Sequence, residues 1–203
     1  PIQVLNYAQD LPVELIAAAR KACDRSGAQL IFDEVQCGVG RCGAFTTAQA
    51  IGITPDLLTL AKGLASGLPI AAVVTSDAIA AQIKQGDLGS TFGGGPVPCA
   101  AALATLAVID EERLCENAVA IGEFLRHGAL ALGPDKVVAV QGRGLLLGLR
   151  LRRPAVEVQT ALLRHHIIVG TSSDPSVLRL MPPLSFSASE AELLLQALAE
   201  VLS

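Results

Sequence analysis

Short apolar runs that end at a polar residue mark the first half of the chain. Residues 28–32 (AQLIF) run into Asp33, residues 57–61 (LLTLA) run into Lys62, and residues 70–75 (IAAVVT) form a third run. Apolar runs of this length, bounded by glycine, proline or polar residues, are typical of buried strands. The pattern therefore predicts at least two buried strands, each with an ionisable residue at its carboxyl end.

Segments with helical spacing separate these runs. Apolar residues recur every three or four positions in residues 11–25 and 96–109, and shorter helices are expected at residues 44–51 and from Ser76 or Asp77 to Lys84. Alternating strands and helices are typical of α/β domains. Residues 1–112 therefore predict an α/β domain around a mainly parallel sheet.

The second half of the chain has a different pattern. Residues 137–149 predict two strands about a glycine turn, and further strands are expected near residues 167–169 and 177–180. The final helix begins at Ser187, and Glu190 three positions later completes a capping-box pattern. With helices expected at 111–132 and 154–165, residues 113–203 predict a smaller α+β domain.

Asp33 and Lys62 suggest a chemistry because of where they stand. In open α/β sheets, ligands bind at the carboxyl ends of the strands. A lysine amine that bonds to a cofactor's aldehyde, with an acid that holds a pyridinium nitrogen, is the basic equipment of pyridoxal phosphate enzymes. Taken singly, Lys62 reads as a solvent-facing lysine and Asp33 as a turn residue. Their shared setting favours a catalytic and cofactor-binding pair.

Two further segments carry candidate binding residues. Ser90 and Thr91 stand in a glycine-rich loop at residues 85–95, which is either flexible or a set of hydroxyl and backbone donors for a phosphate. Arg179 interrupts an apolar strand. Its planar guanidinium suits a bidentate clamp on a substrate carboxylate, and a structural salt bridge is the alternative.

Composition excludes several classes of function. The 203 residues are 51% hydrophobic and 17% charged, with a net charge of −4, which argues against nucleic-acid binding. We find no apolar stretch of membrane-spanning length. The five cysteines show no disulfide or zinc-binding pattern, so we expect no metal and a reduced, cytoplasmic environment.

Four motifs in order resemble one enzyme family. They lie at residues 33–43 (DEVQCGVGRCG), 54–63 (TPDLLTLAKG), 89–94 (GSTFGG) and 178–184 (LRLMPPL). Together they are similar to the class III, ornithine/acetylornithine-type, pyridoxal phosphate-dependent aminotransferases. The resemblance covers only the C-terminal half of the family pattern, and residues 1–3 are similar to the middle of a further family motif. We therefore expect a fragment of a longer enzyme.

The resemblance implies a fold and a set of roles. The fold is the pyridoxal phosphate-dependent transferase fold type I, in which residues 1–112 would be the C-terminal part of the large cofactor-binding domain and residues 113–203 the small domain. In this fold Lys62 and Asp33 would hold the cofactor. Val35 would pack on the cofactor ring and Gln36 would hydrogen-bond its 3′-oxygen. The turn with Ser90 and Thr91 would serve the cofactor of a neighbouring subunit, which implies a homodimer with shared active sites.

The resemblance also implies a reaction in amino-acid biosynthesis. The expected substrates are an amino acid and a 2-oxo acid. The terminal amino group of an acylated diamino acid, such as N-acetylornithine, would move to 2-oxoglutarate. Two alternatives remain open: an aminomutase, racemase or decarboxylase of the same fold, or a truncated module without activity.

Overall fold

The computed structural model describes residues 2–3, 9–91 and 93–203, and these form two compact units. The first unit comprises residues 12–39 and 44–113. The second comprises residues 114–203 together with two short earlier segments, the described part of residues 2–11 and Gly40–Gly43.

The sequence predicts a single boundary between residues 112 and 113, which would assign both early segments to the first unit. The two early segments join the second unit through long-range contacts that local sequence patterns do not show. The Arg143 guanidinium forms an ion pair with Asp10 at 3.0 Å, and the Leu145 amide donates to the Arg41 carbonyl at 3.0 Å. The later part of the division lies between Arg113 and Leu114.

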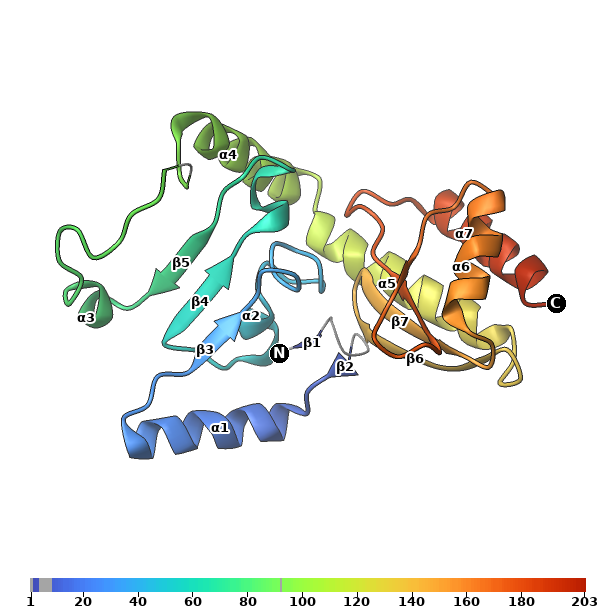
Figure 1. Cartoon of the computed structure of the whole chain (residues 1–203), viewed down its shortest axis with the longest axis horizontal. Coiled ribbons are helices and arrows are strands. Elements are labelled where there is room, and N and C mark those ends of the chain that lie inside the picture. The colour runs from blue at the N-terminus through green and yellow to red at the C-terminus, as the bar shows by residue number, and fades with distance from the viewer. Residues whose placement is uncertain (1, 4–8, 92) are drawn as a thin grey trace. The chain divides into compact units, whose positions relative to one another are not determined.

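A three-stranded sheet with order β3-β4-β5 organises the first unit (Figure 1). β3 and β4 are parallel, as predicted, but β5 is antiparallel to β4. The expectation of parallel pairing is wrong there because too few residues separate β4 from β5 for a full crossover connection. The elements of this unit are α1 (Val13–Ser26), β3 (Ile31–Asp33), α2 (Thr47–Ile51), β4 (Leu57–Leu60), the 3₁₀ helix η1 (Lys62–Ala65), β5 (Ala72–Thr75), α3 (Asp77–Ala80) and α4 (Pro96–Glu111).

The helix predicted through Lys84 ends early. α3 stops at Ala80, and none of its side chains is buried. Ser76 caps it by accepting from the Ile79 amide, as expected from the sequence. A helix without a buried face lacks the tertiary packing that stabilises most short helices, so one turn is all that forms.

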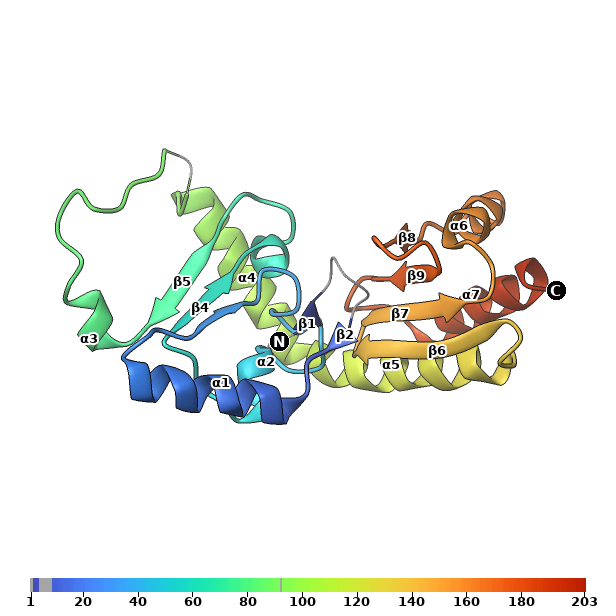
Figure 2. The ribbon, with the colours of Figure 1, turned by 60° about the horizontal axis from the view of Figure 1, so that its bottom comes forward.

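A four-stranded antiparallel sheet with order β6-β7-β9-β8 forms the second unit, with α5 and α7 along one of its faces (Figure 2). Its core consists of leucines, valines, alanines and an isoleucine from the strands and helices, and includes Leu147, Leu149 and Leu178, all 1% exposed or less. The elements are β1 (Ile2–Gln3), β2 (Gln9–Asp10), α5 (Leu114–Ala131), β6 (Val137–Arg143), β7 (Leu146–Leu151), α6 (Ala155–Arg164), β8 (Gly170–Thr171), β9 (Val177–Leu180) and α7 (Ala188–Val201).

Two local predictions in this unit have different outcomes. The capping box of the last helix is confirmed, because Ser187 accepts from the Glu190 amide and Glu190 accepts from the Ser187 amide. The strand expected near residues 167–169 is wrong. Ile168 is 88% exposed, the Val169 carbonyl accepts from the Gln159 side chain, and the strand begins at Gly170.

Candidate active site

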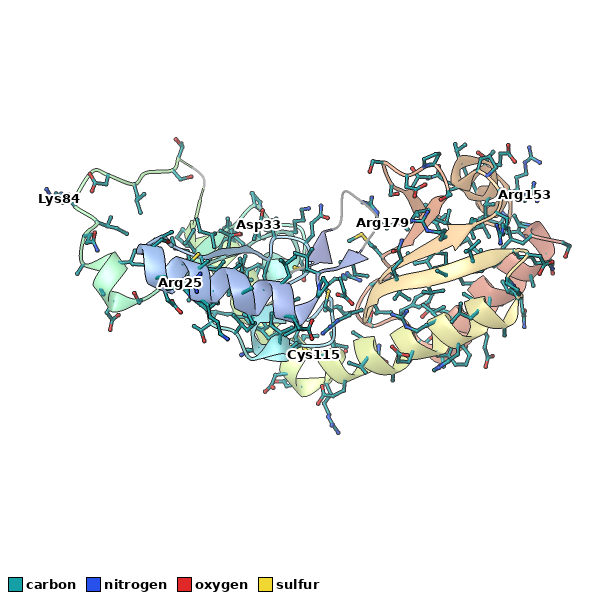
Figure 3. The ribbon with its side chains drawn as sticks, turned by 90° about the horizontal axis from the view of Figure 1, so that it is seen from below. Arg25, Asp33, Lys84, Cys115, Arg153 and Arg179 are labelled. Atoms are coloured by element: carbon teal, nitrogen blue, oxygen red, sulfur yellow. The ribbon has the colours of Figure 1, made fainter. Side chains whose placement is uncertain are left out.

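Parallel pairing of β3 and β4 places Asp33 and Lys62 at the same edge of the first sheet. Asp33 is in register with Thr59, and Lys62 follows three residues later, just beyond the end of β4. Figure 3 labels Asp33 at the end of β3. The carboxyl ends of parallel strands are where α/β sheets bind ligands, so the two residues occupy the expected position.

The Asp33 carboxylate is held by one of its two oxygens. Its Oδ1 accepts from the Thr59 hydroxyl at 3.0 Å and from the Val35 amide at 3.1 Å. The side chain is exposed, and among the described residues no hydrogen bond reaches Oδ2. Asp33 therefore presents an oriented anionic oxygen at the sheet edge, as a partner for a protonated ring nitrogen requires.

Lys62 has an unusual backbone conformation. Its φ is +53°, in the left-handed region, where a residue with a side chain is strained by about 1–2 kcal/mol. Buried Leu64 and Ala65 anchor the following 3₁₀ turn, and Ser66 hydrogen-bonds Thr105 of α4 at 2.9 Å. The surroundings therefore hold this strained turn in place and leave the Lys62 side chain exposed.

Val35 and Gln36 lie in the turn directly after Asp33, and both are half-buried. The Gln36 Oε1 atom is buried without a hydrogen-bond partner. Buried polar atoms nearly always have a partner, so an unsatisfied amide beside Asp33 fits a site that is completed by a polar ligand atom. The unpaired atom is an acceptor and would pair with a donor, so the expected contact of Gln36 with the cofactor's 3′-oxygen stays a prediction.

Ser90 and Thr91 lie apart from this sheet edge. Both are exposed in the long segment between α3 and α4, which arches away from the ends of β3 and β4 in Figures 1 and 2. The Ser90 hydroxyl accepts from the Gly93 amide at 2.8 Å, which gives the loop a local turn. Phe92 of the same motif lies outside the described residues.

Glu34 has a structural role that the sequence did not reveal. It is fully buried, and its carboxylate accepts from the Thr47 amide and hydroxyl, both at 2.6 Å, and from the Ala48 amide at 2.8 Å. These amides are unpaired donors at the start of α2, where a negative charge is favoured. Glu34 thus ties the turn after Asp33 to α2. Close packing against Gly38, where an added Cβ would lie 2.8 Å from the Glu34 carbonyl, completes this turn.

Glu34→Ala should destabilise the protein by about 2–4 kcal/mol, because it leaves buried donors at the start of α2 without an acceptor. Glu34→Gln should cost less, since one oxygen remains to accept. Thermal and urea unfolding of both variants would measure the effect, with the exposed Glu111→Ala as the matched control. Equal stability of Glu34→Ala and Glu111→Ala would contradict the assigned role.

Arg179 lies on β9 in the second unit and is labelled in Figure 3. It is in register with Gly148 on one side and Gly170 on the other. A Cβ at Gly170 would meet the Arg179 guanidinium at 3.2–3.3 Å, so the glycine makes room for it. Within the described chain no hydrogen bond or ion pair engages this half-buried guanidinium.

Two arginines that the sequence left unassigned have structural contacts. Arg143 pairs with Asp10, as described above. The Arg41 guanidinium donates to the Leu145 carbonyl at 3.2 Å and to the Pro182 carbonyl, and burial lowers the pKa of this guanidinium. Arginine stays protonated in proteins even so, and Arg41 therefore acts as a half-buried cationic donor to two carbonyls.

Two other kinds of feature are absent from the residues that the structure describes. No helix in the described ranges is both long and apolar enough to cross a membrane. Residues 2–3, 9–91 and 93–203 also contain no group of three or more histidine, cysteine or acidic side chains arranged to hold a metal ion.

Comparison with known sequences gives one consistent family. The sequence model described as aminotransferase class-III matches residues 9–202. The acetylornithine aminotransferase of Mycobacterium tuberculosis is 44% identical over 191 residues, which cover 94% of this chain and 48% of the relative. That of Streptomyces coelicolor is 44% identical over 204 residues, covering 100% and 50%. The chain thus spans about half the length of the curated relatives it matches.

Solved structures agree with these sequences. The acetylornithine aminotransferase from Elizabethkingia anophelis has a TM-score of 0.87 at 28% identity, covering 94% of this chain and 52% of that protein. A transaminase from the marine bacterium Virgibacillus has a TM-score of 0.93 at 28% identity, covering 100% and 51%. At these identities the likeness extends beyond general architecture.

Proposed function

The chain belongs to the class-III aminotransferase family, and from that premise we propose that its residues serve a pyridoxal phosphate-dependent transaminase. Its fold is the type I fold of that cofactor's transferases, as expected from the sequence. One observation carries the proposal. The parallel pairing of β3 and β4 brings an oriented carboxylate and an exposed lysine to one sheet edge.

The residues of the chain have distinct tasks in this proposal. Pyridoxal phosphate, when bound, supplies an aldehyde carbon that can carry an amino group and a ring that withdraws electrons. The Lys62 amine would hold that carbon between turnovers and then move the proton from the substrate carbon. The Asp33 Oδ2 would keep the ring nitrogen protonated. Gln36 would orient the ring by donating from its side-chain NH₂ group to the 3′-oxygen, and Val35 would pack on the ring face.

The proposed donor is N-acetylornithine or a similar acylated diamino acid, and the proposed acceptor is 2-oxoglutarate. The relatives named acetylornithine aminotransferase support this choice. The full-length protein should convert the two substrates to glutamate and the corresponding terminal aldehyde. The test is whether glutamate forms only when both substrates are present. If folded, cofactor-loaded protein formed no glutamate from them, the proposed reaction would be wrong.

The same assay separates the alternative reactions of this fold. A mutase, racemase or decarboxylase would convert the amino substrate without an external 2-oxo acid. A strict requirement for the oxo acid therefore supports transamination. An inactive module would show turnover under neither condition.

We propose that the enzyme works as a cytoplasmic homodimer. The exposed loop with Ser90 and Thr91 lies away from the edge with Asp33 and Lys62, so its hydroxyls suit a phosphate held by the partner subunit. Exposed apolar side chains on α4, such as Val97 at 69% and Leu103 at 71%, suit a buried interface. Sedimentation of the full-length protein as a monomer would contradict this assembly.

Arg179→Lys should weaken 2-oxo acid binding by roughly 10- to 100-fold, because a lysine replaces a two-donor fork with a single point charge. The effect should be larger for 2-oxoglutarate than for N-acetylornithine. The oxo acid carries its carboxylate on the reacting carbon, whereas the reacting carbon of the donor lies at the far end of its side chain. Single-turnover measurements of each half-reaction would give the affinity for 2-oxoglutarate and the affinity for N-acetylornithine separately.

The matched control for this variant is Arg150→Lys. Arg150 lies on the neighbouring strand β7, where it forms an ion pair with Asp174 at 2.9 Å. The Arg150→Lys variant should be slightly less stable than the wild type and should bind both substrates with unchanged affinity. If Arg179→Lys behaved in the same way as Arg150→Lys, the carboxylate-clamp role would be wrong.

A further inference from the structure

The backbone pairing of β7 and β9 ends just before the chain segment that follows Arg179. The last registered pair is Leu147 with Leu180, and the same register continued would place Leu146 opposite Met181 and Leu145 opposite Pro182. Proline has no backbone N–H and cannot donate to a ladder. Pro182 therefore cannot donate a hydrogen bond to the Leu145 carbonyl, and a direct rung between these two positions is missing.

Arg41 occupies the place of that missing rung. Its Nη1 donates to the carbonyls of both Leu145, which directly precedes β7, and Pro182, which lies two residues beyond the end of β9. The Arg41 carbonyl also accepts from the Leu145 amide at 3.0 Å. Close packing fixes this arrangement, because a Cβ on Gly144 would lie 2.8 Å from the Arg41 carbonyl oxygen. Arg41 thus joins the start of β7 to the segment just beyond β9.

We infer that Arg41 is a positioning residue for Arg179, setting how the Arg179 guanidinium meets the carboxylate of the 2-oxo acid. This inference rests on the proposed function, in which Arg179 binds that carboxylate. Arg179 is three residues before Pro182, and glycines stand beside it on both neighbouring strands. No side chain at positions 148 or 170 can therefore support it from the sides, and the end of β9 is where its position is secured.

Arg126 offers a matched control within the same unit. Its guanidinium also donates to two backbone carbonyls, those of Val140 at 2.7 Å and Gly142 at 2.5 Å. Those carbonyls lie on β6, which pairs with β7 and not with β9. Loss of either arginine removes the same kind of contacts, but only Arg41 contacts the segment that follows Arg179.

The test compares Arg41→Met, Arg41→Lys, Arg126→Met and Arg179→Lys in the full-length protein loaded with cofactor. Arg41→Met should raise the KM for 2-oxoglutarate about tenfold, with kcat changed much less, because misplaced binding groups weaken catalysis from a distance. Arg41→Lys should lie between wild type and Arg41→Met. Amide hydrogen exchange in residues 177–184 should quicken in Arg41→Met. Arg126→Met should lose similar thermal stability with KM and this exchange unchanged.

Each outcome has a defined meaning. An unchanged KM in Arg41→Met, or an equal rise in Arg41→Met and Arg126→Met, would overturn the positioning role. If Arg41→Met does not fold, Arg41→Lys decides, and a wild-type KM there overturns the role as well. An unchanged KM in Arg179→Lys would show instead that the proposed carboxylate clamp is wrong, whatever the Arg41 variants do.

Discussion

Replacing Lys62 with alanine should lower transamination by roughly 10⁴-fold or more, because it removes both the amine that holds the cofactor and the base that moves the proton. The other three lysines have different settings. Lys21 lies on α1, Lys84 on the exposed loop beyond α3 (Figure 3), and Lys136 just before β6. None of them follows a strand of the parallel pair, so none can take over.

Chemical labelling tests this assignment directly. Borohydride reduction of the cofactor-loaded full-length protein, followed by peptide mapping, should place the pyridoxyl group on Lys62. Lys84→Ala is the control and should keep both the label and the activity. A label on Lys21, Lys84 or Lys136 in the wild-type protein would refute the assignment, and so would a Lys62→Ala variant that retained turnover.

The elements that hold Asp33 and Lys62 were predictable because their signals are local. Each apolar run ends at a charged residue, and parallel strands bring their carboxyl ends to one edge. The capping box at Ser187 and Glu190 is equally local, since both partners lie within one turn. Such short-range patterns need no knowledge of distant segments, and the structure confirms the two strands and the capping box. The expected burial of the strands is wrong for β3, where Ile31 is 58% exposed and Phe32 is the one buried residue.

The roles of Glu34 and Arg41 were not predictable because their partners are remote. Glu34 satisfies donors at Thr47 and Ala48 only after the intervening loop folds back. Arg41 lies 104 residues before Leu145 and 141 residues before Pro182. A pattern of residue types contains no signal for such pairings.

Asp33→Asn should lower turnover by roughly 10²–10³-fold while leaving stability nearly unchanged. An asparagine keeps an oxygen to accept from Thr59 and Val35, as Oδ1 of Asp33 does, but it carries no negative charge. The ring nitrogen would then lose its counter-charge, and the ring would withdraw electrons less well. Asp33→Ala should lose as much activity and some stability, whereas Asp33→Glu, which keeps the charge, should retain more.

Thr59→Val separates the charge of Asp33 from its orientation. It removes the hydroxyl that donates to Oδ1 and leaves the carboxylate in place, so activity should fall only a few-fold, by the contribution of about one hydrogen bond. In both half-reactions, the single-turnover rate should be highest for the wild type, a few-fold lower for Thr59→Val and far lower for Asp33→Asn. Both half-reactions should show this order because each depends on the same electron withdrawal by the ring. If Asp33→Asn turned over at the wild-type rate, the electron-withdrawing role of Asp33 would be wrong. If Thr59→Val were as slow as Asp33→Asn, orientation and not charge would be the main contribution of this carboxylate.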